Sequence, residues 1–413
     1  MTVRERLEAL YALGEGEGAN RPGLSPAEEE AHALAAGWMA DAGLEVSRDS
    51  AGNLYGRLLG RRPDLPEVWV GSHLDSVPRG GRYDGALGVV AALEAVARMD
   101  APASRTIAVV AFRDEEGWRF GHGFFGSRAV AGALGPGALD RHDRDGVSLR
   151  DALTSLGLQA QEGGDWLAGP PAAYLELHIE QGPVLAGADA PVGIVDSIVG
   201  LVELEIEFHG REGHAGTSPM DARRDAALCA AAFQIMAAER ARAIPRAVAT
   251  VGSLRLEPGA SNVVPRLAHL VVDARAPDDE RLDALEAALR EAAASAASEH
   301  GCAVEIERVG RTAPVIADRR VVSALEAAAP GAPRLPSGAG HDAQILGAAG
   351  VPVGMLFARS LAGGISHSPL EESTDADIEE SVEVLRRALP ELCDRVGVAS
   401  SAAPPSRADP RDG

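Results

Sequence analysis

The chain has 413 residues, of which 46% are hydrophobic and 24% are charged, an ordinary globular composition with length enough for two domains. A net charge of −22 argues against nucleic acid and anionic membrane surfaces as partners, because both would repel the chain. All 39 basic residues are arginine, and the absence of lysine excludes Schiff-base chemistry, a Walker phosphate loop and a metal site bridged by a carbamylated lysine.

The ends of the chain and its cysteines indicate where the protein works. The N-terminus has no signal-like stretch, and no apolar run approaches the roughly 20 residues that a membrane span needs. The three cysteines, Cys229, Cys302 and Cys393, are far apart, so they predict small buried side chains rather than disulfides or a thiolate metal site. We therefore expect a cytoplasmic protein.

The first half of the chain alternates helices with short apolar strands. A helix is predicted over residues 27–43, after the start signal Ser25-Pro26 and before Gly43. Apolar strands are predicted over residues 67–72, 106–112 and 172–177, with a helix at 85–99. This alternation indicates an α/β layer with a mostly parallel sheet, in which functional groups gather at the carboxyl ends of the strands.

From about residue 198 the pattern changes to β-α-β-β-α-β. The predicted elements are a strand at 201–208, a helix at 221–242, strands at 247–256 and 267–275, a helix at 279–299 and a strand at 303–309. That order predicts a ferredoxin-like domain, residues 198–313, inserted into a catalytic domain of residues 1–197 and 314–397. A strand is predicted at 351–357, and residues 398–413 are predicted to form a disordered tail.

Imidazoles and carboxylates stand at the ends of the predicted strands or in glycine-rich loops. They are His73, Asp84, Glu116, His178 and His367. Together these groups suit zinc, manganese or cobalt. Asp84 is followed by a glycine and preceded by a Gly-Gly pair, so it could be approached from both sides and could bridge two ions. Two metal ions can activate a water and polarise the carbonyl under attack.

Three acidic residues add further roles. Asp75 lies two residues after His73, on the same face of an extended strand, and could orient the imidazole. Of the adjacent Glu115 and Glu116, one could bind metal while the other takes a proton from the attacking water. Each feature alone has an ordinary alternative: a core or surface histidine, a solvated pair of glutamates, or a turn. These alternatives do not explain why all five ligand candidates stand at strand ends or in glycine-rich loops.

The sequence around these residues, and the order of the segments that contain them, resemble the amidase, hydantoinase and carbamoylase family of dinuclear metallohydrolases. This family includes N-carbamoyl-L-amino-acid hydrolases, allantoate amidohydrolases and β-ureidopropionases. The matching segments, within residues 25–395, are GSHLDSVPRGGRYDGALGV, DEEGWRF, LELHIEQGPVL, GHAGTSPMDARRDA, SGAGHDA and GISHSP. The resemblance implies a metallopeptidase-like mixed sheet with helices on both faces. It also implies that the inserted domain is a lid through which a homodimer forms.

The resemblance further implies a role for each matching residue. His73, Asp84 and His178 would hold one divalent ion, and Asp84, Glu116 and His367 the other, with Asp84 bridging. Glu115 would be the general base. The implied substrate contacts are Gln181, His214, Asn262, Arg275 and Gly364, and the histidine that matches His214 can reach a neighbouring subunit's site.

Without the resemblance, the residues implied as substrate contacts could also have purely structural roles. Arg275 ends a strand and could grip a substrate carboxylate, but it could equally form a surface ion pair. His214 lies in a glycine-rich turn, where it could donate to an oxyanion or be an ordinary loop histidine. The pair His341-Asp342 is interpreted as shaping the site, because the five ligands already fill it.

Departures from the family bear on the substrate. Leu201, Val202 and Glu203 stand where the family often has glutamine or arginine, so Glu203 would repel an anionic group that reached it. This departure argues against allantoate, with its second ureido arm, as the substrate. Trp118 and Arg359 replace small or apolar residues and could narrow or recharge the pocket.

The sequence therefore predicts metal-dependent hydrolysis of an amide or ureido C–N bond. The favoured substrate is an N-carbamoyl-L-amino acid, which would give the amino acid, ammonia and carbon dioxide. The alternatives are an allantoate amidohydrolase, a β-ureidopropionase or an N-acyl-amino-acid hydrolase. A binding protein that lost catalysis is a further alternative, against which the unligated base Glu115 argues.

Overall fold

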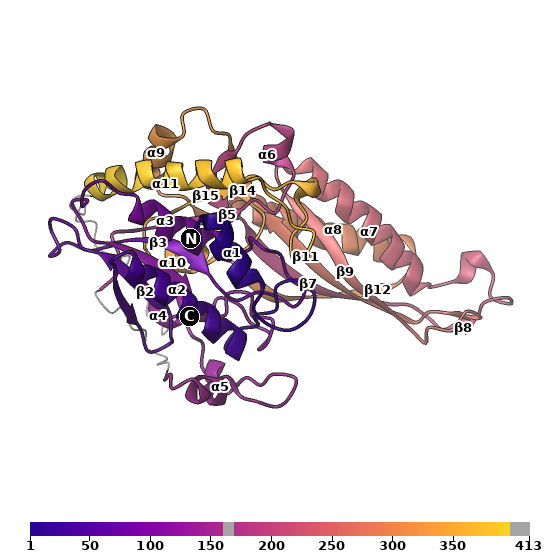
Figure 1. Ribbon diagram of the computed structural model, residues 1–413. Coiled ribbons are helices and arrows are strands. Elements are labelled where there is room, and N and C mark those ends of the chain that lie inside the picture. Colours follow the sequence, from indigo (N-terminus) through magenta and orange to yellow (C-terminus); the bar gives the residue numbers. More distant parts are fainter. Residues whose placement is uncertain (160–168, 397–413) are drawn as a thin grey trace, which may run out of the picture. The chain divides into compact units, whose positions relative to one another are not determined.

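The computed structural model describes residues 1–159 and 169–396. Its internal contacts divide the chain into two units, shown in Figure 1. The first unit contains Met1–Ile194, Asp318–Pro333 and the chain from Val351 onward, and the second contains Val195–Ala317 and Arg334–Gly350. The predicted tail, 398–413, lies outside the described residues. Among the described helices, none is long and apolar enough to cross a membrane.

The first unit is built on a mixed sheet. Its strands lie in the order β1 (Glu45–Arg48), β2 (Leu54–Leu58), β4 (Ile107–Phe112), β3 (Val68–His73), β5 (Ala173–Ile179), β15 (Val353–Ala358) and β6 (Val192–Ile198). The central strands β4, β3, β5 and β15 are parallel, whereas β1, β2 and β4 pair antiparallel. The predicted α/β class with a mixed sheet is therefore confirmed.

The central strands are buried along their whole length because both of their faces are covered. Every residue of β3, β4, β5 and β15 is buried, as expected for parallel strands between layers. Helix α3 (Ala86–Ala97) packs on β3, β4 and β5, and α11 (Asp375–Arg395) packs on α3 and α9 (Arg319–Ala328). The apolar runs that predicted these strands are thus confirmed to within a residue or two.

The remaining helices of the first unit are shorter or lie toward its edge. They are α1 (Val3–Tyr11), α2 (Pro26–Asp41), α4 (Phe125–Ala131), η1 (Ala138–Asp140), α5 (Leu149–Ser155), α6 (Val184–Gly187) and η3 (Ala362–Gly364). Helix α2 begins as predicted: the Ser25 side chain accepts a hydrogen bond from the Glu28 N–H, and proline occupies the first turn.

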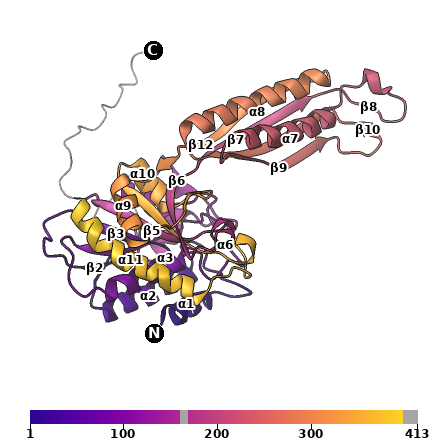
Figure 2. The same cartoon turned by 90° about the horizontal axis from the view of Figure 1, so that it is seen from above.

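The second unit contains a four-stranded antiparallel sheet with two helices. The strand order is β12 (Ala303–Thr312), β7 (Gly200–His209), β11 (Leu267–Ala276) and β9 (Val248–Glu257). Helices α7 (Ala226–Ala243) and α8 (Asp279–Glu299) pack side by side, as Figure 2 shows. The chain order of these six elements is β-α-β-β-α-β, as in the predicted pattern. That this unit serves as a lid remains a prediction.

Smaller elements complete the second unit. They are β8 (Gly213–His214), η2 (Met220–Ala222), β10 (Val263–Val264), β13 (Val315–Ile316), β14 (Arg334–Ser337) and α10 (Asp342–Ala348). Strand β6 runs from the first unit into the second, where β13 and β14 pair with it.

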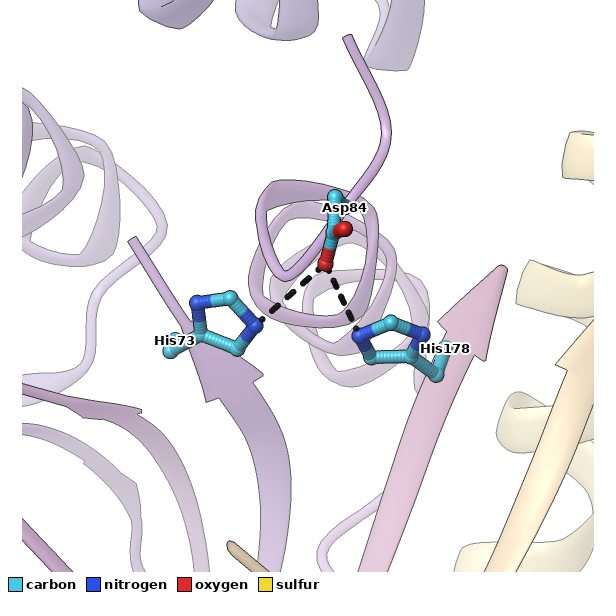
Figure 3. A group of neighbouring side chains, drawn as sticks. All are labelled: His73, Asp84 and His178. Atoms are coloured by element: carbon cyan, nitrogen blue, oxygen red, sulfur yellow. Dashed lines mark ion pairs between the residues drawn. The ribbon is translucent and has the colours of Figure 1, made fainter. Parts of the chain in front are cut away.

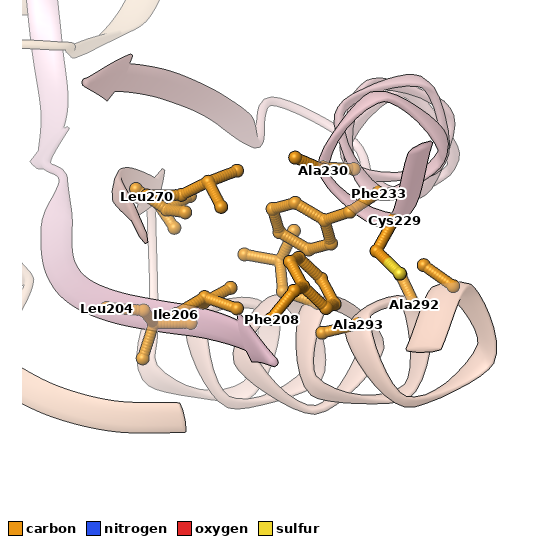
Figure 4. Close-up of a cluster of buried hydrophobic side chains, with 14 of the residues drawn as sticks. Leu204, Ile206, Phe208, Cys229, Ala230, Phe233, Leu270, Ala292 and Ala293 are labelled. Carbon is orange, nitrogen blue, oxygen red and sulfur yellow. The ribbon is translucent and has the colours of Figure 1, made fainter. Parts of the chain in front are cut away.

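Alternation along β7 builds the core of the second unit. The side chains of Val202, Leu204, Ile206 and Phe208 are buried, and the intervening residues are not. Phe208 meets Phe233 of α7 with ring centroids 6.1 Å apart, and Cys229 is buried in the same cluster (Figure 4). Cys229 and Cys393 are buried as predicted, but Cys302 is only partly buried and lies at the edge of this core.

One predicted boundary is wrong. The helix expected over 221–242 begins only at Ala226, because the Asp225 side chain accepts the Ala227 N–H and so caps the helix there. The preceding residues form the short 3-10 turn Met220–Ala222 after Pro219. Residues 220–225 contain no proline or glycine to mark the break, so its signals in the sequence are Pro219 before the turn and the capping residue Asp225 after it.

Replacing Phe233 with alanine should destabilise the second unit by about 3–5 kcal/mol, because a fully buried aromatic side chain leaves a cavity. Denaturant unfolding followed by circular dichroism measures the change. The matched control is Glu239→Ala on the exposed side of the same helix, which should unfold like the parent chain. Equal stability of the two variants would contradict the packing described for this core.

Candidate metal-binding active site

Three imidazoles and two carboxylates predicted as ligands gather at the carboxyl ends of the parallel strands. His73 is the last residue of β3, and His178 is the penultimate residue of β5. Asp84 ends the loop that leads into α3, Glu116 follows β4, and His367 follows β15. Parallel strands expose their carboxyl ends at one edge of the sheet, so residues nearly 300 positions apart converge there.

The residues form two groups that share Asp84. In the first group, Asp84 Oδ1 lies 3.6 Å from His73 Nε2 and 3.2 Å from His178 Nε2 (Figure 3). In the second, Asp84 Oδ2 lies 3.3 Å from His367 Nε2, which is also 3.3 Å from Glu116 Oε2. Within each group, the potential ligand atoms lie within 4.8 Å of one another. One carboxylate therefore directs its two oxygens at two separate clusters.

Asp75 fixes two parts of the site at once. Its Oδ1 lies 3.1 Å from His73 Nδ1, so it orients the imidazole as the sequence predicts. The same carboxylate accepts hydrogen bonds from the main-chain N–H of Glu115, at 3.0 Å, and of Glu116, at 3.1 Å. The second task was not predicted, because residues 40 positions away in sequence supply the donors.

His178 and Gly85 show how tightly the first group is built. His178 Nδ1 lies 2.9 Å from the carbonyl oxygen of Ile179, which leaves Nε2 directed at Asp84. Gly85 has φ +62°, and a Cβ there would lie 2.4 Å from the His73 ring. No larger residue fits beneath the imidazole, so this glycine is required by space as well as by conformation.

The acidic and imidazole side chains of the site stabilise one another's charges. Burial opposes ionisation of Asp84, but its interactions with the imidazoles of His178, His367 and His73 outweigh burial and hold the pKa of Asp84 well below its usual range. Interactions with Asp84 and then Glu116 raise the pKa of His367 to about 11. In this arrangement the imidazoles supply the positive charge that balances the carboxylates.

The donor atoms also fit a bound metal. Among the described residues, His73 Nε2 and Glu116 Oε1 are buried and have no hydrogen-bond partner. Buried polar atoms are rarely left unpaired in folded proteins. Imidazole nitrogens and carboxylate oxygens at this spacing are ligands for zinc and similar divalent ions. The residues present therefore fit divalent metal binding.

Glu115 stands beside the first group without belonging to it. Its side chain is 8% exposed, and Oε2 lies 3.8 Å from His73 Nε2. It is absent from both groups of potential ligands. A buried carboxylate next to the ligands but outside them is suitably placed to move a proton.

Two of the predicted substrate contacts border the two groups. Gln181, with φ +55°, donates from Nε2 to Asp84 Oδ2 at 2.9 Å and to Ser366 Oγ at 2.9 Å. Gly364 has φ +79°, and a Cβ there would lie 2.3 Å from the carbonyl carbon of Gly182. In this structure Gln181 thus supports Asp84, and Gly364 permits two loops to approach closely.

The other predicted substrate contacts belong to the second unit. His214 in β8 is exposed and lies opposite Val263 of β10, and the carbonyl oxygen of Asn262 accepts the Ala215 N–H at 2.9 Å. The structure thus brings His214 and Asn262 close together. Arg275, at the end of β11, forms an ion pair with Asp273 through Nε and Nη2, both at 2.8 Å, and Nη1 donates to the Gly338 carbonyl oxygen.

Residues with uncertain roles in the sequence have defined partners in the structure. His341 Nε2 lies 2.7 Å from Ser337 Oγ, and neither His341 nor Asp342 belongs to the two groups. Arg359 pairs with Asp377 and Asp189. Trp118 is partly exposed, with the Arg144 guanidinium 4.6 Å from its ring centroid.

A third cluster that could hold an ion lies in the second unit. Glu207 and His209 of β7 and Glu305 of β12 are partly or largely exposed, and both glutamates lie near His209 Nε2. Exposed acidic groups commonly gather on a strand surface without a metal, and none of these three residues is buried, whereas each of the first two groups contains the buried Asp84.

Sequence reasoning missed Glu371 and Ser366 as parts of the site. The buried Glu371 carboxylate accepts the main-chain N–H groups of Tyr83 and Asp84, and Ser366 Oγ lies 3.2 Å from Asp84 Oδ2. Burial and then the Asp84 charge raise the pKa of Glu371 to about 7. The proximity of both residues to His367 in sequence was the signal available for finding them.

A mixed α/β sheet that gathers imidazoles and carboxylates at the carboxyl ends of its parallel strands is typical of a metal-binding hydrolase. Comparison with known proteins agrees. Residues 69–391 match the sequence profile of peptidase family M20/M25/M40. The chain belongs to this family.

Individual relatives cover almost the whole chain. An N-carbamoyl-L-amino acid amidohydrolase of Geobacillus stearothermophilus is 43% identical over 400 residues, which are 93% of this chain and 97% of that protein. A probable allantoate deiminase of Oryza sativa subsp. japonica is 36% identical, over 90% of this chain and 84% of its own length. A crystal structure of an amidase of the hydantoinase/carbamoylase family from Burkholderia multivorans superposes with a TM-score of 0.87, at 34% identity, and covers 95% of this chain and 97% of that one. The chain is accordingly an amidohydrolase that acts on C–N bonds.

Asp84→Ala should remove metal from both groups, because Asp84 is the residue they share, whereas His367→Ala should affect only the second. Metal content of each purified variant, measured by elemental analysis after dialysis, is expected to fall further for Asp84→Ala than for His367→Ala. His122→Ala, a histidine outside both groups, is the control and should keep the parent content. An Asp84→Ala variant with full metal content would show that Asp84 is not a shared ligand.

Proposed function

We propose that this chain hydrolyses an N-carbamoyl-L-amino acid to the amino acid, ammonia and carbon dioxide, with two divalent ions at the shared site. The observation that carries the proposal is the Asp84 carboxylate, whose oxygens face separate imidazole-containing groups while Glu115 stands beside them. The 43% identity to an N-carbamoyl-L-amino acid amidohydrolase over nearly the full length supports the substrate class.

Under this proposal, His73, Asp84 and His178 hold one ion, and Asp84, Glu116 and His367 hold the other. Bound ions at such a site supply activation of the attacking water and polarisation of the scissile carbonyl. Zinc, manganese and cobalt all suit imidazole and carboxylate ligands. Asp75 contributes by holding the His73 ring and the main chain of Glu115 and Glu116 in fixed positions.

Glu115 serves as general base and then as general acid. Its carboxylate accepts the proton of the attacking water and passes it to the leaving nitrogen as the C–N bond breaks. Burial of the side chain keeps bulk water away from the transferred proton.

Arg275, Asn262 and His214 bind the substrate under the same proposal. A guanidinium has five N–H groups, and three donate to Asp273 and Gly338, which leaves two for a substrate carboxylate. The Gly216 N–H donates to Nδ1 of His214, so Nε2 of this imidazole would carry the proton and donate to the oxyanion that forms from the carbonyl. Gln181 and Gly364 border the Asp84 side of the site.

We also propose that the chain forms a homodimer through the second unit. Strand β9 is an edge of the four-stranded sheet, with only β11 beside it among the described strands. It exposes Val248, Leu254 and Leu256, and α7 exposes Ile235. An apolar edge strand of ten residues invites pairing with a second chain, since its free main-chain groups and side chains would both find partners there.

Glu115→Gln tests the proton transfer. The amide keeps the shape of the side chain but cannot accept the proton, so kcat should fall by about 10²- to 10⁴-fold. Metal content should stay at the parent level, because Glu115 lies outside both groups. Glu180→Gln is the matched control: one oxygen of this buried carboxylate, Oε1, accepts the N–H groups of both Val184 and Leu185, which the glutamine oxygen can also do. Retained turnover in Glu115→Gln would refute the assignment.

A substrate panel tests the proposed function directly. Metal-loaded protein is assayed for ammonia release from N-carbamoyl-L-amino acids, N-carbamoyl-β-alanine and allantoate, and for amine release from N-acetyl-amino acids. We expect turnover of an N-carbamoyl-L-amino acid that a chelator abolishes. Preferential turnover of allantoate, N-carbamoyl-β-alanine or an acylated amino acid would reassign the substrate. Metal binding without turnover of any compound would favour a binding protein that has lost catalysis.

A further inference from the structure

Glu371 is a buried carboxylate that belongs to neither group of potential ligands. It lies four residues after His367, and its side chain is 3% exposed. Its main-chain N–H donates to the Ser368 carbonyl oxygen at 3.1 Å, so a turn returns it toward the site. A carboxylate is buried at considerable cost unless its oxygens are paired, and here the pairing is specific.

The Glu371 carboxylate joins two loops that are distant in sequence. Its Oε2 accepts the main-chain N–H of Tyr83 at 2.6 Å and of Asp84 at 3.2 Å, and its Oε1 accepts the Ser366 hydroxyl at 3.1 Å. Tyr83 and Asp84 lead into α3, whereas Ser366 directly precedes His367. One side chain thus ties the loop of the shared carboxylate to the loop of the second group's imidazole.

A ring of hydrogen bonds closes around Asp84. The single proton of the Ser366 hydroxyl is within reach of both Glu371 Oε1 and Asp84 Oδ2, the latter at 3.2 Å. Gln181 Nε2 donates to Asp84 Oδ2 and also to Ser366 Oγ. Asp84 is therefore held at its main chain by Glu371 and at its side chain by Ser366 and Gln181.

Gly81 leaves the space that the Glu371 carboxylate occupies. A Cβ on Gly81 would lie 2.2 Å from Glu371 Oε2 and 2.4 Å from its carboxyl carbon. Gly81 does not adopt a positive φ, so the close approach of Glu371, rather than backbone conformation, is what requires a glycine here. Any side chain at this position would displace the Glu371 carboxylate from the N–H groups of Tyr83 and Asp84.

We propose that Glu371 is a positioning residue that sets Asp84 relative to His367, so that Asp84 Oδ2 and His367 Nε2 can hold the same ion. His367 itself has φ +51° and is half exposed, so packing alone does not fix its place. The inference rests on the metal pair of the proposed function. It adds that the second ion depends on an acceptor outside its ligands, through contacts that fix ligand orientation.

Comparing Glu371→Gln with Glu371→Ala distinguishes the effect of the hydrogen bonds of Glu371 from the effect of its charge. In Glu371→Gln, the amide oxygen can accept the two main-chain N–H groups, and the amide nitrogen can donate to Ser366 Oγ, whose proton then goes to Asp84 Oδ2. Glu371→Gln should therefore behave like the parent chain. In Glu371→Ala, the two N–H groups and the Ser366 hydroxyl lose their acceptor, and the two loops lose their connection.

The experiment measures zinc binding to the full chain after its metal has been removed. Each variant is titrated with Zn²⁺ in competition with a chromogenic chelator, so the readout needs no substrate. For Glu371→Ala we expect the weaker-bound ion to lose about 10- to 100-fold in affinity, while the other changes little. On a substrate found by the panel, kcat should fall at limiting zinc and recover at excess zinc, with a smaller effect on KM.

Two further variants provide an independent test and a control. Gly81→Ala leaves Glu371 in the chain but displaces its carboxylate, so it should weaken the binding of the same ion. If Glu371→Ala does not fold, the zinc affinity of Gly81→Ala tests the proposal in its place. Asp49→Ala is the matched control, because it also removes a buried carboxylate that accepts a main-chain N–H, in this case from Asn53 in the turn between β1 and β2. Its zinc affinities should equal those of the parent chain.

Three results would overturn the proposal. One is a folded Glu371→Ala or Gly81→Ala chain that binds both ions with parent affinity. Another is Glu371→Gln binding as weakly as Glu371→Ala, which would make the charge decisive. The third is a parent chain that binds fewer than two ions. A parent chain that binds two ions but hydrolyses nothing would refute the proposed function alone, because the zinc affinities still test Glu371.

Discussion

The sharing of one buried carboxylate, Asp84, between two groups of potential metal ligands is the constraint on which the rest of the site depends. Each of its oxygens must point in a defined direction, because Oδ1 faces His73 and His178 while Oδ2 faces His367. A side chain with one rotatable carboxyl group meets both demands only if its main chain is also fixed. The Gly80–Gly85 loop and the segments that hold it are arranged around that requirement.

The negative charges buried at this edge of the sheet also need a nearby positive charge. Arg21 is almost fully buried and donates from Nε to the carbonyl oxygen of Leu74, between His73 and Asp75. Burial lowers the pKa of Arg21 to about 10, while the charges of Asp75 and Asp84 act in the opposite direction. Arg21 therefore remains protonated at neutral pH. It places a permanent positive charge under the carboxylates, where an unpaired buried acid would be strongly destabilising.

The sequence predicted those features that follow from local patterns. The runs 67–72, 106–112 and 172–177 correspond to β3, β4 and β5, because a short, mainly apolar run is typical of a strand buried on both faces. The five ligand candidates could be found because each follows such a strand or lies in a glycine-rich loop. The position of Asp75 two residues after His73 also predicted their contact, since alternation in an extended chain puts both on one face.

What sequence could not supply were contacts between loops that only the fold brings together. The bonds from Asp75 to the N–H groups of Glu115 and Glu116 depend on β3 and β4 being adjacent and parallel. The bond from Glu371 to the Asp84 N–H spans 287 positions. Helix α7 likewise starts later than its periodicity suggests, because one side chain, Asp225, caps it. Such acceptors of main-chain N–H groups leave no periodic trace in a sequence.

Arg275 illustrates how a structural contact can itself shape specificity. Asp273 occupies the Nε and Nη2 edge of the guanidinium, and the Gly338 carbonyl oxygen occupies one position on Nη1. The planar fork is thus locked in orientation before any ligand arrives, which reduces the entropy lost on binding. The same contact places a negative charge beside the cation, and β7 brings Glu203 directly opposite Asp273. Under the proposed function, the two remaining N–H groups would donate to a substrate carboxylate, whereas additional negative charge near this strand pair would meet Asp273 and Glu203. The proposed function therefore predicts a preference for substrates with one carboxylate over those with more.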